Sequence, residues 1–91
     1  MDVKLTSIPV CADGIKTRGE TFGMLLVSKR TPILTLNDDS TAIWRKLDGA
    51  KDVSSIVSEL KNDYDCPENE LEETVLSFLD SCHKLGLIEF R

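Results

Sequence analysis

The sequence contains few of the side chains that carry catalysis or bind metals. Its three cysteines are widely spaced and form no Cys-x-x-Cys pair, so neither a disulfide framework nor a zinc knuckle is predicted. His83 is the one histidine, and it has no evident acid partner. Glycine-rich phosphate loops and recognisable nucleophile motifs are also missing. We therefore predict that the chain is not an enzyme and that it holds no metal or cofactor of its own.

Long apolar runs and basic clusters are missing as well. No run approaches the roughly 20 apolar residues that cross a bilayer, and Met1 to Lys4 lacks the basic and apolar regions of a secretory signal. The net charge of -5 disfavours a nucleic-acid binder, because such proteins concentrate Lys and Arg on one face. We expect a cytoplasmic protein that binds neither membranes nor nucleic acid.

The first third of the chain has the pattern of a small β-sheet. Residues 15–20, 23–28 and 31–36 predict three antiparallel strands in a meander. Pro32 near the start of the third strand fits an edge position, where its missing N–H leaves no ladder partner unsatisfied. Residues 1–13 contain a proline too and are expected to form a loosely held N-terminal arm, so the domain itself should span residues 14–91.

The remainder has the pattern of three helices. Residues 37–49 begin with side chains that cap a helix and carry Trp44 inward, while residues 52–64 begin with a capping Asp. The third helix should start at a proline and run to a glycine over residues 67–86. Residues 87–90 should then form a short strand or an extended tail against the sheet. The predicted fold class is α+β and winged-helix-like, with a three-stranded meander, three helices and a C-terminal strand or tail.

The third helix carries more apolar surface than a core requires. At about 100° per residue, one narrow stripe contains Leu71, Val75, Phe78, Cys82 and Leu85. Leu79 lies at the flank of this stripe, and Leu76 lies well outside it, beside His83. Such surplus apolar surface is a candidate wall for a binding groove. The sequence does not reveal which side of the helix faces that groove.

The order and spacing of these segments resemble the PqqD-like family. The resemblance covers about residues 14–90, leaving the arm outside it, and rests on Leu36-Asn37, Ile43-Trp44, Leu47-Asp48-Gly49, Val53 with Ile56-Val57, Pro67 with its following glutamates, Phe78-Leu79 and Gly86-Leu87-Ile88. Two positions depart from the family pattern: Cys66 replaces the usual capping Asp or Ser before Pro67, and Cys82 stands where Leu is frequent. Both departures concern local capping or packing.

The resemblance implies a recognition domain for ribosomally made peptides that are modified after translation, a RiPP recognition element. The leader of the precursor peptide would add a strand beside the third strand of the meander and lie against the third helix. On this reading the peptide-binding residues are Ile33, Leu34, Thr35 and Leu36 on the edge and Val75, Leu76, Leu79 and His83 on the helix. A separate enzyme, often a radical S-adenosylmethionine protein with iron–sulfur clusters, would modify the peptide, so those cofactors would belong to the partner.

Two other functions remain open from the sequence. A winged-helix DNA-binding protein would use the third helix for recognition, but residues 67–85 contain four glutamates and only Lys84 as a base. A self-associating module would instead pair the exposed strand edge with a second copy of the chain.

Overall fold

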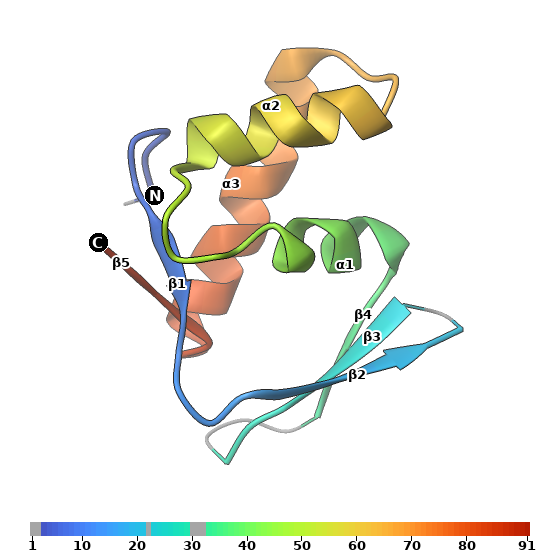
Figure 1. Cartoon of the computed structure of the whole chain (residues 1–91), viewed down its shortest axis with the longest axis vertical. Helices are drawn as coiled ribbons and strands as arrows, with labels where there is room; N and C mark the ends of the chain where they lie inside the picture. The colour runs from blue at the N-terminus through green and yellow to red at the C-terminus, as the bar shows by residue number, and fades with distance from the viewer. Residues whose placement is uncertain (1–2, 22, 30–32) are drawn as a thin grey trace.

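A computed structural model of the chain describes residues 3–21, 23–29 and 33–91 (Figure 1). Its elements follow in the order β1 (Pro9–Cys11), β2 (Lys16–Glu20), β3 (Gly23–Val27), β4 (Leu34–Leu36), α1 (Asp38–Arg45), α2 (Val53–Asp63), α3 (Glu68–Lys84) and β5 (Ile88–Phe90). The helices lie to one side of the β2-β3-β4 meander, with α1 nearest to it (Figure 1). This arrangement confirms the predicted fold class. Among the described residues, no helix has both the length and the apolar character needed to span a bilayer.

The meander is antiparallel with the strand order β2-β3-β4. β3 pairs with β4 in a register that sets Leu25 opposite Thr35. The three predicted strands are thus confirmed, although β4 is shorter than the expected range 31–36. Thr31 and Pro32, which were expected in that strand, lie outside the described residues.

Side-chain caps fix where the first two helices begin. The Ser40 N–H donates to Asn37 Oδ1 at 2.8 Å before α1, and the Ser55 N–H donates to Asp52 Oδ1 at 2.9 Å before α2. α3 begins without such a cap, because Pro67 occupies the N-cap position and its side chain accepts nothing. The two caps that the sequence predicts are therefore present.

The core lies between the meander and the three helices. Trp44 is 7% exposed and belongs to this core, which confirms the prediction that it points inward. α3 contributes a face that differs from the expected stripe. Leu79 is 0% exposed, although it was placed at the flank, whereas Leu85, expected in the stripe, is 44% exposed. The physical reason is that α3 packs against both α2 and β5, so its buried face is broader and rotated toward Leu79.

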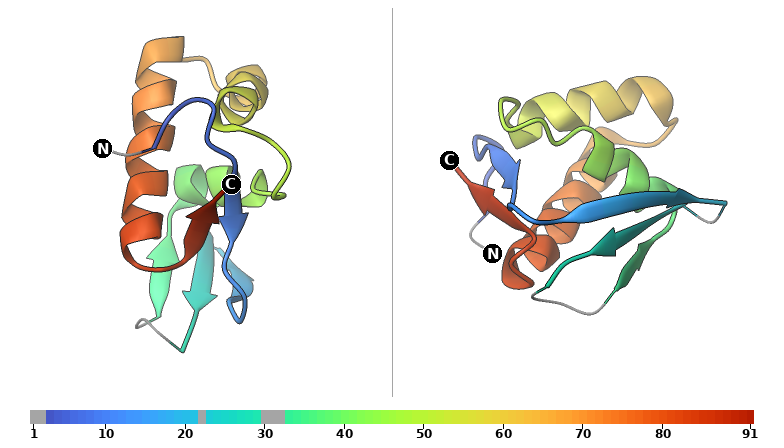
Figure 2. Two further views of the ribbon diagram at one scale, coloured as in Figure 1. Left: turned by 90° about the vertical axis from the view of Figure 1, so that its left-hand side faces the viewer. Right: turned by 60° about the horizontal axis from the view of Figure 1, so that its bottom comes forward.

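The N-terminal arm is held more firmly than predicted. β1 pairs with β5 in a separate two-stranded antiparallel sheet, so β5 does not join the meander. The N–H groups of Val53 and Ser54 donate to the carbonyl oxygens of Ser7 and Leu5 at 3.0 and 2.9 Å. Val3 is 7% exposed, and the arm passes alongside α3 in both Figure 1 and Figure 2. The expectation of a loosely held arm was wrong, because these long-range backbone bonds are not visible in a local pattern.

Candidate functional site

The outer edge of β4 is the first part of the candidate site. β4 is the last strand of the meander, and no described residue pairs with its other side. Leu36 is buried and Leu34 half-buried, whereas Thr35 between them is exposed, as the alternation predicts. Ile33, just before the strand, is 63% exposed. An edge of this kind presents unpaired N–H and C=O groups to any extended chain that approaches it.

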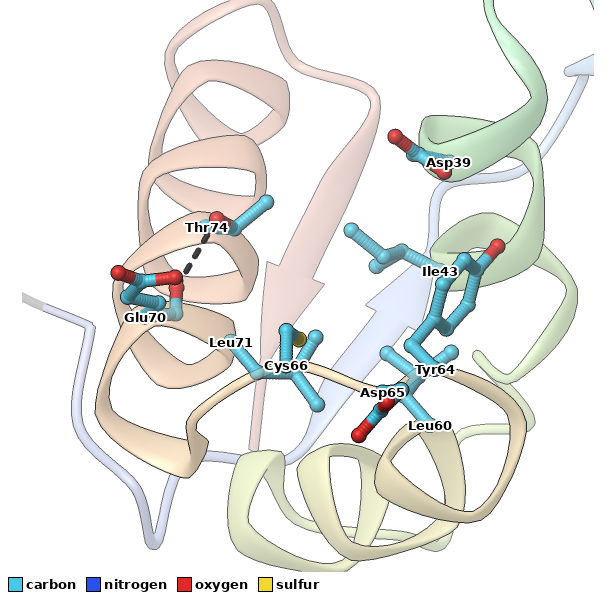
Figure 3. Close-up of a pocket in the computed structure, with 9 residues that line it drawn as sticks. All are labelled: Asp39, Ile43, Leu60, Tyr64, Asp65, Cys66, Glu70, Leu71 and Thr74. Atoms are coloured by element: carbon cyan, nitrogen blue, oxygen red, sulfur yellow. Dashed lines mark hydrogen bonds between the residues drawn. The ribbon is translucent and has the colours of Figure 1, made fainter.

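A pocket of about 310 Å³ is the second part of the site (Figure 3). It opens between α1, the last turn of α2 and the first turns of α3 (Figure 3). The residues that line it are Asp39, Ile43, Leu60, Tyr64, Asp65, Cys66, Glu70, Leu71 and Thr74. We call it the α1–α3 pocket.

The floor and the rim of the α1–α3 pocket differ in chemistry. Ile43, Leu60 and Leu71 are at most 7% exposed and supply an apolar floor. Asp39, Asp65 and Glu70 are exposed acidic residues, and none of these three forms an ion pair with a residue that the structure describes. Among the described residues that line the pocket, none is basic. The pocket is therefore apolar inside and negatively charged at its mouth.

The pKa of Tyr64 reflects the negative charge around this residue. Its pKa is raised above the usual value, first by burial and then by the negative charges of Asp39, Asp63 and Asp38, together with a side-chain hydrogen bond to Asp39. Burial and the neighbouring carboxylates both disfavour ionisation of the Tyr64 phenol, because ionisation would give it a negative charge. The surroundings of the Tyr64 phenol are therefore negatively charged.

The β4 edge and the α1–α3 pocket follow one another along the chain. β4 ends at Leu36, Asn37 caps α1, and Asp39 in the first turn of α1 already lines the pocket. Beyond its Leu36 end, β4 is thus followed at once by the turn of α1 that lines the pocket.

The four α3 residues that were predicted to bind the peptide differ in burial and in the side of the helix on which they lie. Val75 and Leu79 are both 0% exposed and belong to the core. His83 is exposed, and its ring lies 5.0 Å from that of Phe90 on β5, measured between ring centroids. Leu76, two helical turns before His83 and half-buried, shares that flank.

The opposite flank of α3 faces α1. Glu70 and Thr74 line the pocket together with Asp39 and Ile43 of α1, and Phe78 follows Thr74 by one helical turn. Of the sequence-predicted set, the structure thus brings together the residues of β4, while Leu76 and His83 lie toward β5. Contact of the predicted set with a peptide remains a prediction.

Sequence reasoning missed the α1–α3 pocket. The glutamates that follow Pro67, Glu70 among them, entered the sequence argument only through the family pattern and the charge of the third helix, and Tyr64 entered it only as the end of the second helix. The pocket residues come from three helices and a loop, and only packing brings them together. The one available signal was the concentration of acidic residues at the start of both α1 and α3.

Comparisons with known proteins place the chain in context. The family profile described as "Coenzyme PQQ synthesis protein D (PqqD)" matches residues 23–88. The fold is similar to that of TbiB1 in complex with the TbiA(beta) leader peptide, with a TM-score of 0.79, 18% identity and coverage of 88% of this chain and 94% of that chain. No curated protein sequence matches.

Two further solved structures are similar in fold. A lasso peptide synthetase B1 complexed with the leader peptide has a TM-score of 0.79 and 17% identity, with coverage of 90% of this chain and 98% of that chain. The PqqD truncation of Methylobacterium extorquens PqqCD, solved by NMR as a functional and stand-alone RiPP recognition element, has a TM-score of 0.81 and 21% identity, with coverage of 96% and 94%.

Proposed function

This chain belongs to the PqqD family, and from that premise we propose that it binds the leader segment of a ribosomally made precursor peptide. The observation that carries the proposal is the outer edge of β4, which pairs with no residue that the structure describes. Two proteins of similar fold were solved with a leader peptide bound, which supports the same use of the fold here.

Strand addition would supply both affinity and selectivity. The leader's backbone would hydrogen-bond to the free N–H and C=O groups of β4, and every second side chain would point toward the side of α3 that carries Thr74 and Phe78. Backbone bonds do not depend on the leader's sequence, so the contacts of alternate side chains would set the preference for one leader over another.

The modification itself would belong to a partner. We propose that the chain adds no catalytic group and presents the core of the precursor to a modifying enzyme, a radical S-adenosylmethionine protein whose iron–sulfur cluster and S-adenosylmethionine lie in that enzyme. Tethering through the leader would raise the effective concentration of the core at the partner's active site to the millimolar range that short flexible linkers give, on the order of 1 mM.

A titration tests the proposal. A fluorescently labelled candidate precursor peptide is prepared in two forms, full-length and without its leader. Each form is titrated with the purified protein, and a duplex DNA serves as control. We expect saturable binding that requires the leader and no binding to DNA. Binding to DNA alone, or self-association by sedimentation without any peptide binding, would replace the proposal with one of the two alternative functions.

A further inference from the structure

The α1–α3 pocket has a chemistry that restricts its occupant. The apolar floor of Ile43, Leu60 and Leu71 accommodates methylene groups. The rim holds the carboxylates of Asp39 and Asp65, while the Glu70 side chain lies at the outer side of α3 (Figure 3). A purely apolar side chain would contact the apolar floor, but it would displace water from the carboxylates without replacing the hydrogen bonds that the water makes. An acidic side chain would be repelled at the rim.

A long basic side chain matches both parts of the pocket. Lys and Arg bury an apolar stem while their charged head stays at a polar rim. Arginine matches better than lysine, because its planar guanidinium binds carboxylates in a bidentate manner and stacks on an aromatic ring such as Tyr64. Tyr64 is half-buried and lines the same pocket as all three carboxylates.

Helix stabilisation accounts for only part of this arrangement. Asp39 and Glu70 lie in the first turns of α1 and α3, where the helix dipole favours negative charge. That effect does not require the two residues to share a pocket. It also does not apply to Asp65, which lies in the loop between α2 and α3.

We propose that the α1–α3 pocket holds one basic side chain, arginine in preference to lysine, of the leader peptide whose strand is captured by β4. The inference rests on the proposed function and deepens it by naming the residue class that the site selects. Because Asp39 of the pocket follows the Leu36 end of β4 closely in the chain, the basic residue should stand at a fixed distance from the strand-forming segment of the leader.

A peptide display library provides a test that does not require the natural precursor. Random peptides are selected on the unaltered protein, on the double variant Asp39→Asn with Asp65→Asn, and on the control variant Glu73→Gln. Glu73 is an exposed residue of α3 outside the pocket. Each variant is checked by thermal denaturation. All three substituted side chains are exposed, so we expect at most a small loss of stability, from the first-turn carboxylate of α1.

The selections separate this inference from the proposed function. We expect the unaltered protein and the Glu73→Gln control to select alternating apolar positions with Arg or Lys at one fixed position, and the double variant to keep the apolar pattern and lose the basic residue. An apolar pattern without a basic position, or a basic preference that survives in the double variant or disappears in the control, overturns the inference alone. Failure to select any strand-like pattern overturns the proposed function.

Citrulline gives the quantitative test. It has nearly the shape of arginine, but it carries no charge and a carbonyl oxygen replaces one NH₂ donor. Replacing the selected arginine by citrulline therefore removes the charge and one donor of the bidentate contact while keeping the apolar stem. We expect about a three- to tenfold loss of affinity on the unaltered protein and a much smaller loss on the double variant. Equal losses on both proteins would show that the arginine binds elsewhere.

Discussion

At the scale of single residues, Gly23 shows how closely the strands of the meander approach one another. Its φ of +139° is unfavourable for other residues, and a Cβ there would collide with the Leu36 carbonyl oxygen on β4. We expect Gly23→Ala to lower the free energy of unfolding by at least about 1–3 kcal/mol, the typical effect of backbone strain alone. Urea denaturation measures the change.

Gly19 is the matched control for that prediction. It lies opposite Met24 in the same meander, has no positive φ and has nothing within 4 Å of an added Cβ. Gly19→Ala should therefore leave the stability nearly unchanged. Equal effects of the two substitutions would contradict the close approach of Gly23 to β4.

Cys82 illustrates how burial controls reactivity. It is 4% exposed, and its pKa is raised to about 12, first by burial and then by the nearby Cys11 thiol. Since the thiolate is the reactive form, we expect iodoacetamide to alkylate Cys82 only as fast as the domain unfolds, and half-buried Cys66 to react sooner. Mass spectrometry of timed samples distinguishes the sites. Equal rates in the native protein would show that Cys82 is accessible.

At the scale of elements, the cap of α2 makes stability depend on pH. The pKa of Asp52 is lowered chiefly by the backbone N–H of Ser55 and also by its hydroxyl. A lowered folded-state pKa gives a contribution that is present above the unfolded value of 3.8 and is lost as the pH falls through the lower folded value. Asp48, held by the N–H groups of Ala50 and Lys51, acts in the same direction.

Asp52→Asn tests this contribution, because asparagine caps a helix without titrating. We expect urea midpoints, measured from about pH 6 down to about pH 3, to fall less steeply in the variant than in the unaltered protein. The pH dependence that remains should include that of Asp48. Parallel curves for the two proteins would show that the cap does not contribute to the acid sensitivity.

The two flanks of α3 provide a matched pair for the binding site. Phe78 and Leu76 are both half-buried, but Phe78 follows Thr74 on the flank toward α1, while Leu76 shares the flank of His83 toward β5. Both truncations to alanine should destabilise the fold moderately. We expect Phe78→Ala to weaken leader binding about tenfold and Leu76→Ala to change it less than about twofold, as measured by titration at a temperature where both variants are folded. The reverse order would return the site to the flank that the sequence favoured.

The elements themselves could largely be predicted from the sequence. Asn37 and Asp52 marked the starts of α1 and α2 because capping is a local interaction, and the alternation of Leu34, Thr35 and Leu36 showed which side chains point inward. The orientation of α3 could not be predicted. It depends on how β5 and α2 share its surface, and an angular plot of one helix contains no information about its neighbours.

At the scale of the whole molecule, β1 near the start of the sequence pairs with β5 near its end. Cys11 lies opposite Ile88 in the β1–β5 register, and the Arg91 N–H donates to the Ile8 carbonyl oxygen at 2.9 Å. This pairing and the α1–α3 pocket both join segments far apart in sequence, and for that reason neither was predicted. Because β5 pairs with β1 and not with the meander, the outer edge of β4 has no strand partner among the described residues.

The central claim, that a leader peptide adds a strand to β4, is tested most directly by methylating backbone nitrogens of the bound leader one at a time. A strand on an edge directs every second N–H toward its partner. We predict that N-methylation at alternate positions lowers affinity at least about tenfold, while methylation at the intervening positions is tolerated. Uniform sensitivity, or none at any position, would contradict strand addition at β4.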